Sequence, residues 1–345
     1  MANPMNVGGQ AVIEGVMMRS PRSLAIAVRR ANGEIVLTER VWESVWERYK
    51  FLRWPFVRGG IVLIEALVNG IQALMFSADQ AMVGMEEDST KAAKEGDGEA
   101  KKAPSEPGAA MSRPMLIGTI VFSLGLAFAI FKGIPHLLTT LVGLNTDQVL
   151  FHVIDGTVKI AMFVGYVALI GRMRDIKRVF QYHGAEHKSI YAFENGEELT
   201  VENAKKYTTL HPRCGTSFII IVLLSSIIVF MVVFPFLPPF HDNRLVNALL
   251  QILVKLPLML PVAGVSYEFL RWSAKHMNNP VVKLLVKPGL WLQLITTQEP
   301  DDSQLEVALV ALRKALWRER VGVQELQTEK KGSLEVYGSL AEVTF

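Results

Sequence analysis

Residues 182–188 read Tyr-His-Gly-Ala-Glu-His-Lys, a spacing that suits metal binding. On a helix, His183 and His187 lie one turn apart on the same face, where their rings can bind one metal ion together. Glu186 then lies beside the pair and can take a proton from a water molecule on the metal. The order His-x-x-Glu-His also matches the inverted-zincin pattern, although Gly184 lowers the helix propensity. The segment therefore predicts a site for Zn²⁺ or another divalent metal.

A second polar cluster, residues 208–217, follows in the same predicted loop and contains His211, Arg213 and Cys214. Zinc binds imidazole nitrogen and thiolate sulfur, and a catalytic zinc site keeps one position open for water. The first two histidines with either His211 or Cys214 would leave that position open, whereas all four ligands would close it and make a structural site. Arg213, or Arg19 near the N-terminus, can stabilise negative charge that develops during a reaction.

Each of these residues also has a purely structural interpretation. The paired histidines can lie near lipid headgroups, and Glu186 can be a solvated charge beside Lys188 or Arg178. A lone cysteine is more often a small buried side chain than a ligand. Arg213 can anchor a lipid phosphate. The metal site therefore depends on whether the fold brings the two clusters together.

The composition indicates a membrane protein. Of the 345 residues, 50% are hydrophobic and 20% are charged, and the net charge of +3 is too small to predict a nucleic-acid partner. The single cysteine excludes an internal disulfide and a CxxC motif. A spanning helix needs roughly 20 mostly apolar residues. Four segments qualify: 115–134, 149–170, 218–237 and 245–265.

Charged residues within these segments need partners. Asp155 and Lys159 are four residues apart in the second segment, so we expect them to pair within the bundle. Lys255, in the fourth, has a stem long enough to reach an interface or an internal partner.

Lys and Arg gather between the second and third segments and after the fourth, and the opposite connections are poor in them. The positive-inside rule therefore predicts that both termini and the histidine loop are cytoplasmic. A fifth apolar segment, 59–76, contains Glu65, Asn69 and Gln72 and would break this charge bias if it crossed. It is predicted to lie on the cytoplasmic face or to dip into it as a re-entrant turn.

The remaining sequence predicts soluble elements on the same side. Residues 24–29 and 35–39 resemble two strands joined by a turn at Asn32-Gly33, and 7–16 can add a third strand. Apolar residues repeat with helical spacing over 303–318, where Ser303 and Glu306 resemble a capping box. This helix is expected to pack on the cytoplasmic unit.

The sequence thus predicts a mainly α-helical polytopic membrane protein with four transmembrane helices, a small N-terminal β-hairpin unit and cytoplasmic or interfacial helices. Its predicted units are a β-containing N-terminal unit (1–58), an interfacial or re-entrant helix (59–84), a flexible linker (85–113), transmembrane helices 1 and 2 (114–171), a His/Cys loop (172–217), transmembrane helices 3 and 4 (218–268), cytoplasmic C-terminal helices (269–328) and a tail (329–345).

Several blocks resemble the YqhQ-like family of bacterial membrane proteins. They are 8–19, 182–189, 211–218, 266–268 and 288–300, and together they extend over nearly the whole chain. The resemblance implies a metal-dependent enzyme without indicating a reaction. It marks matches to family blocks at Glu14, Arg19, His183, Glu186, His187, His211, Cys214 and Glu268.

Three functions follow from these observations. The first is a membrane-embedded, metal-dependent hydrolase at the cytoplasmic face, with a metal-activated water and Glu186 as the base. The second is a non-catalytic scaffold or assembly factor with a structural metal or polar cluster, which binds membrane-protein partners or forms a homo-oligomer. The third is a transporter, although four spans and few buried charges make it the weakest. The lipid bilayer is a predicted partner in all three.

Overall fold

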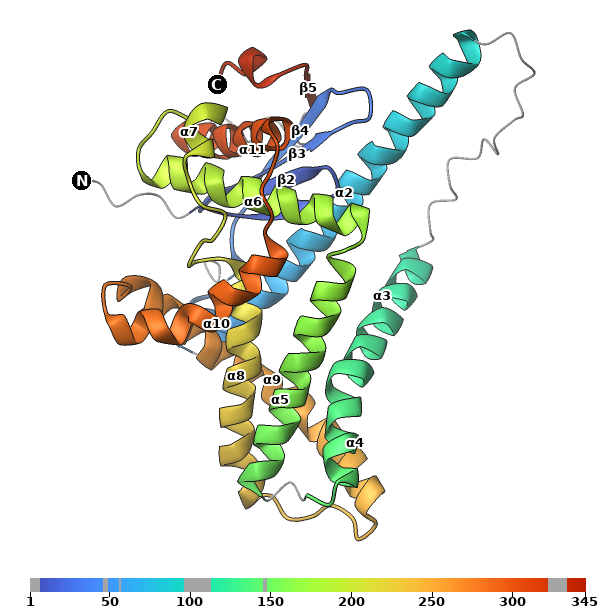
Figure 1. Cartoon of the computed structure of the whole chain (residues 1–345), viewed down its shortest axis with the longest axis vertical. Helices are drawn as coiled ribbons and strands as arrows, with labels where there is room; N and C mark the ends of the chain where they lie inside the picture. The colour runs from blue at the N-terminus through green and yellow to red at the C-terminus, as the bar shows by residue number, and fades with distance from the viewer. Residues whose placement is uncertain (1–6, 46–48, 56, 96–112, 145–147, 322–333) are drawn as a thin grey trace.

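The computed structural model describes residues 7–45, 49–55, 57–95, 113–144, 148–321 and 334–345. In Figure 1 long helices form the lower part of the molecule, and a β-sheet covered by helices lies above them. The sheet has five antiparallel strands in the order β1-β2-β3-β4-β5. The strands are β1 (Gly8–Val12), β2 (Gly15–Arg19), β3 (Ser23–Arg29), β4 (Ile35–Val41) and β5 (Leu334–Tyr337).

Strands β2 and β3 are buried on both faces of the sheet, because they carry apolar residues at successive positions. Val16 and Met18 point to the face that helices α6 (Arg174–Glu194) and α11 (Asp302–Val321) cover. Met17 points to the opposite face, where it packs in a cluster with Ala73 of helix α2 (Val57–Glu95). The N-terminal unit is therefore the middle layer of a helix–sheet–helix stack.

The predicted hairpin at Asn32-Gly33 is confirmed by β3 and β4, and Gly33 has the positive φ of 90° that such a turn requires. Residues 7–16, which were expected to form a third strand, fold differently. They contain β1 and the start of β2, joined by a turn at Ile13-Glu14. Glu14 has a φ of 51°, a left-handed conformation that sequence alone does not suggest for glutamate.

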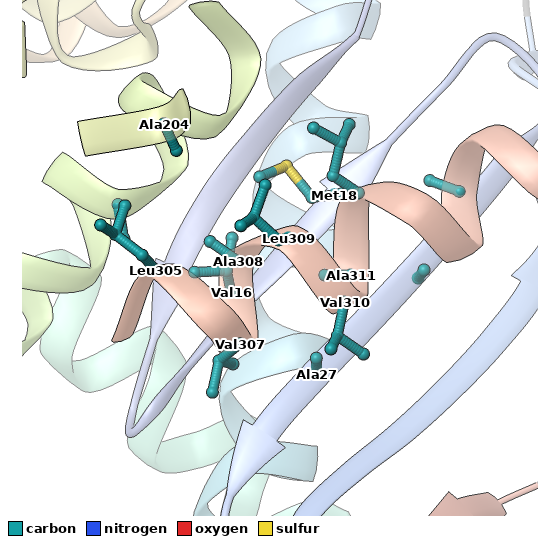
Figure 2. Close-up of a cluster of buried hydrophobic side chains, with 14 of the residues drawn as sticks. Val16, Met18, Ala27, Ala204, Leu305, Val307, Ala308, Leu309, Val310 and Ala311 are labelled. Carbon is teal, nitrogen blue, oxygen red and sulfur yellow. The ribbon is translucent and has the colours of Figure 1, made fainter. Parts of the chain in front are cut away.

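Helix α11 lies at the centre of the larger core, where Figure 2 shows Ala308, Leu309 and Val310 beside side chains of β2 and β3. The prediction that this segment packs on the N-terminal unit is confirmed. Its cap is two residues earlier than predicted: the Gln304 N–H donates to Asp301 at 2.9 Å, and the Gln304 side chain accepts from the Asp301 N–H at 3.0 Å. Glu306 instead pairs with Arg29.

The number of long apolar helices differs from the prediction. Five helices within the described residues, rather than four, are long and apolar enough to cross a membrane, as judged by length and composition: Val57–Val83, Val121–Leu141, Val149–Ile170, Gly215–Phe236 and Leu245–Lys275. The first segment lies in α2. The second is formed by α3 (Arg113–Phe128), η2 (Ala129–Gly133) and α4 (Ile134–Leu141), and the third is α5 (Val149–Ile170). The fourth is formed by α8 (Gly215–Val233) and η3 (Phe234–Phe236), and the fifth lies in α9 (Arg244–Lys275).

The additional helix is α2, which contains the segment 59–76. The polar residues that argued against a crossing bind to the N-terminal unit instead of water. Glu65 accepts hydrogen bonds from the Ser44 hydroxyl at 2.8 and 2.9 Å, and Asn69 accepts from Arg40 at 2.8 Å. Helix α2 also continues to Glu95, into the predicted linker 85–113, of which residues 96–112 lie outside the described residues.

Two further predictions concern charged residues and the C-terminal tail. The Asp155–Lys159 pair is confirmed, and Lys255 reaches the same carboxylate at 3.3 Å. The predicted tail, 329–345, contains β5, which pairs with β4. Both ends of the chain therefore contribute strands to one sheet.

Candidate functional site

Helix α6 and the N-terminus of α8 bring three of the predicted metal ligands together. His183 and His187 lie on α6, and Cys214 is the residue that caps α8. One ligand atom from each of the three lies within 4.8 Å of the other two, and His183 Nε2 is 3.1 Å from the Cys214 sulfur. Two imidazoles and a thiolate form a ligand set typical of zinc.

Backbone carbonyls orient both imidazole rings. His183 Nδ1 lies 2.8 Å from the Thr296 carbonyl oxygen, and His187 Nδ1 hydrogen-bonds to the carbonyl of Thr209. A carbonyl only accepts, so each Nδ1 carries a proton and Nε2 is the nitrogen through which each ring would bind a metal. His187 Nε2 is buried and has no hydrogen-bond partner among the described residues. This is the orientation in which proteins hold metal-binding histidines.

Cys214 is buried, and its sulfur contacts the first turn of α8. The Thr216 N–H donates to it at 3.4 Å, and the Thr216 hydroxyl lies 3.0 Å away. Donors at a helix N-terminus stabilise negative charge. A metal-bound sulfur at this position would accept both of these hydrogen bonds.

Gly184, which lowers the helix propensity of α6, has a structural reason to be glycine. The Gln298 carbonyl oxygen occupies the space that a Cβ at this position would need. The Gln298 N–H also donates to the Phe180 carbonyl at 2.9 Å. The close approach of the two backbones brings the Thr296 carbonyl to His183, so the glycine supports the ring orientation described above.

Glu186 is 5% exposed and lies on the side of α6 that faces β1. It accepts a hydrogen bond from the Gly9 N–H, and its Oε2 atom is buried without a partner among the described residues. Burial raises the pKa of this carboxyl to about 7, and the nearby His183 and the Gly9 N–H oppose the rise. A Cβ on Gly9 would lie 2.9 Å from Glu186 Cδ, so only glycine allows this contact.

Two predicted site residues from the second cluster bind elsewhere. His211 Nε2 lies 3.5 Å from Glu194, and His211 Nδ1 accepts from the Arg213 N–H at 3.3 Å. The Arg213 guanidinium also pairs with Glu194. Burial opposes ionisation of Glu194, but His211 and Arg213 together lower the pKa of its carboxyl. The His211 ring is 5.5 Å from that of His187, and His211 is outside the three-ligand group.

The other residues marked by the resemblance lie farther away. Arg19 points to the α2 face of the sheet, with its guanidinium 3.8 Å from the centre of the Trp42 ring, whereas Glu186 contacts Gly9 from the α6 face. Glu14 pairs with Arg178. Glu268 pairs with Arg58.

One supporting residue was missed from the sequence. Gln293, on helix α10 (Pro280–Thr296), is fully buried and holds the segment before Cys214 in place. Its side chain accepts from the His211 N–H and donates to the His211 carbonyl, each at 2.8 Å, and it donates to Ser217 Oγ at 2.7 Å. Its place in an apolar segment was the one available signal, because a buried glutamine needs polar partners.

Comparison with known proteins gives two matches. The chain is 34% identical over 326 residues to the uncharacterized protein YqhQ of Bacillus subtilis (strain 168), and the match covers 93% of this chain and 95% of that protein. The family described as "Protein of unknown function (DUF1385)" matches residues 54–318. No solved structure matches the chain.

Proposed function

The chain belongs to the YqhQ-like family, and for this member of it we propose a metal-dependent hydrolase at the cytoplasmic face of a bacterial inner membrane. The observation that carries the proposal is the meeting of His183, His187 and Cys214, with both rings oriented by carbonyls. Three protein ligands leave one position of a tetrahedral zinc site open for water or substrate.

The reaction needs a Lewis acid and a base. Bound Zn²⁺, or another divalent metal, supplies the Lewis acid and makes water a better nucleophile at neutral pH. Glu186 is the proposed base, because it lies one residue before His187 and its Oε2 atom has no hydrogen-bond partner among the described residues. It would accept the proton of the attacking water and return it to the leaving group. Arg213 is held by Glu194 and is available for an anionic group only if that pair opens.

The shared sheet supports the proposed orientation. Strands β1–β4 precede the long helices and β5 follows them, so both ends of the described chain lie on one side. Helix α6 packs on the same sheet, which requires an even number of crossings before it and after it. Helix α2 keeps Asn69 and Ala73 against the N-terminal unit, so we infer that α2 stays at the interface and that the other four apolar helices cross.

The positive-inside rule then places this side in the cytoplasm. The exposed Arg172, Arg174 and Lys177 lie between α5 and the first turns of α6. Helix α10 exposes Trp291 and Leu294, which suits a helix that lies at the membrane surface.

Metal analysis of the full-length protein in detergent tests the proposal. We expect one Zn²⁺ or similar ion per chain, lost in His183→Ala, His187→Ala and Cys214→Ser. Glu186→Gln should keep the metal and lower hydrolysis of the probes p-nitrophenyl acetate or p-nitrophenyl phosphate by about 10²–10⁴-fold. Protein without stoichiometric metal would refute the site. Equal rates for wild type and Glu186→Gln would refute the hydrolase.

Cobalt substitution separates a catalytic site from a structural one. Co²⁺ bound to Cys214 should give a thiolate charge-transfer band that Cys214→Ser removes. Azide should change the visible spectrum if one coordination position is open. A spectrum that does not respond to azide would indicate four protein ligands and would favour the structural-metal scaffold over the hydrolase.

A further inference from the structure

A second candidate site lies on the other face of the sheet, in a cavity of about 510 Å³ between the β1–β2 hairpin, α2 and the C-terminal part of α9. Its polar lining includes Arg19, Asn69, Tyr267 and Arg271, together with Gln10 and Ser20. The volume is typical of sites that bind small molecules, about 300–1,000 Å³. The cavity is separated from Glu186 by β1, so it is distinct from the metal cluster.

The guanidinium of Arg19 is the central cation of this cavity. Its Cζ atom lies over the Trp42 ring, 3.8 Å from the ring centre, a cation–π contact that holds the guanidinium beside the cavity. Among the described residues no carboxylate forms an ion pair with it. Burial lowers the pKa of Arg19, a sign that the charged form loses hydration here. An anion in the cavity would compensate that loss.

The charges around the cavity favour an anion. None of the described residues that line it is acidic, and Arg271 adds a second cation four residues after Tyr267. Glu65 is the carboxylate that acts on Arg19, but it is held by the Ser44 hydroxyl and by the Val45 N–H at 2.7 Å. A phosphate suits two arginines, because guanidinium groups bind its oxygens in pairs.

One wall of the cavity is apolar and continues onto the surface of α2. Val62 and Ala66 line the cavity, and the adjoining Leu63, Ile64 and Leu67 are 44%, 53% and 49% exposed. A ligand with a charged head in the cavity could therefore lay an apolar chain along α2. Water-soluble anions need no such surface.

We infer that this cavity binds the phosphate group of an amphiphile, with Arg19 and Arg271 on the phosphate and the apolar chain along α2. The site does not depend on the metal cluster, and it gives Arg19 a binding role on the opposite face of the sheet from Glu186. Free inorganic phosphate shares the head-group chemistry and lacks the chain.

Calorimetric titration of the full-length protein in a non-ionic detergent tests this site. The probes are dioctanoyl phosphatidic acid, dioctanoylglycerol and inorganic phosphate. We expect phosphatidic acid to bind at least about tenfold more tightly than either of the others, because each lacks one of the two recognised parts. Arg19→Gln should weaken phosphatidic acid binding by about tenfold or more. The matched control Arg174→Gln removes an exposed arginine outside the cavity and should bind as wild type does.

A second variant guards against misfolding of Arg19→Gln. Ala66→Phe fills the cavity from an exposed position, keeps Arg19 and should also abolish binding. Wild-type affinity in both Arg19→Gln and Ala66→Phe would overturn the site. Equal affinities for phosphatidic acid and inorganic phosphate would overturn the amphiphile. His187→Ala should bind phosphatidic acid normally, so failure of the metal proposal and failure of this one can be told apart.

Discussion

Among the described residues, two of the buried polar clusters include histidine and can be compared. One is the group of His183, His187 and Cys214 between α6 and α8. The other lies among the apolar helices, where Lys255 donates to His136 Nδ1 at 2.8 Å and also contacts Asp155. The first is proposed here to bind a metal, whereas the geometry of the second argues against one.

The partner of Nδ1 explains the difference. In the first cluster backbone carbonyls accept hydrogen bonds from Nδ1 of both histidines. Lys188, the lysine next to His187, forms an ion pair with Glu299. In the second cluster the Lys255 ammonium donates a hydrogen bond to His136 Nδ1. Its positive charge would repel a divalent ion at this ring. This contrast favours a metal at the first cluster, where neutral acceptors orient both rings and the neighbouring lysine is paired, over the second cluster.

The second cluster is held together by ion pairs and by contacts with aromatic rings. Lys159 and Lys255 both bind Asp155, and the rings of Phe151, Phe230 and Phe234 lie within 5.3–5.4 Å of the Lys255 ammonium. One carboxylate thus serves two ammonium groups, and aromatic faces provide the remaining stabilisation. The cluster cross-links α5 and α9 and makes the stability of the bundle depend on Asp155.

The largest expected effect comes from Asp155→Asn. The substitution keeps the shape of the side chain but removes the charge, and breaking a buried pair by removing one partner costs about 3–5 kcal/mol. We expect the free energy of unfolding in detergent to fall by that amount, while bound metal stays unchanged. Equal loss of metal would show that the two clusters are not independent.

Asp175→Asn is the matched control, because Asp175 is exposed in the first turn of α6. Loss of this helix-terminal carboxylate should cost less than about 1 kcal/mol. If Asp155→Asn were no more destabilising than this control, the two lysines could not both be charged in the native protein.

A medium effect is expected from Gly184→Ala, which acts on the first cluster alone. The added Cβ overlaps the Gln298 carbonyl, so the segment that carries the Thr296 carbonyl must move away from His183. Overpacking typically costs about 1–3 kcal/mol. Loss of a ligand's orienting partner lowers metal affinity by about 10–100-fold. Competition with a chromophoric chelator measures the affinity.

Gly165→Ala provides the comparison within a helix. Gly165 lies in α5, and a Cβ there would meet no atom within 4 Å. Alanine should therefore be neutral, or stabilise the helix by up to about 1 kcal/mol, without any change in metal affinity. Equal metal affinities in the two alanine variants would contradict the role given to the Gln298 contact.

Local patterns predicted much of the fold. The Asn32-Gly33 turn located the β3–β4 hairpin, and the apolar segment 149–170 has the same bounds as α5. Features that depend on distant partners were not predictable in the same way. Strand β5 forms because β4 offers an edge, and the polar residues of α2 are accommodated because the N-terminal unit binds them.

The same distinction between local patterns and distant contacts applies to the candidate site. The sequence named four candidate ligands and left His211 and Cys214 as alternatives for the third position. The fold brings Cys214 to His183 and His187. The orienting groups were not predictable, because the carbonyls of Thr209 and Thr296 belong to the backbone and leave no signature in residue type. The sequence equally could not assign Arg19 to the opposite face, since this depends on the β1–β2 turn that sets the register.

The smallest effect is expected from His211→Gln, and it decides the number of ligands. His211 is occupied by Glu194 and by the Arg213 N–H, so the variant should keep one metal per chain with an affinity within about tenfold of wild type. His187→Gln, the control on α6, should lose the metal. A Co²⁺ spectrum changed by His211→Gln alone would make His211 a fourth ligand. That result would close the coordination position which hydrolysis requires, and the first cluster would then be a structural cross-link, as the second is.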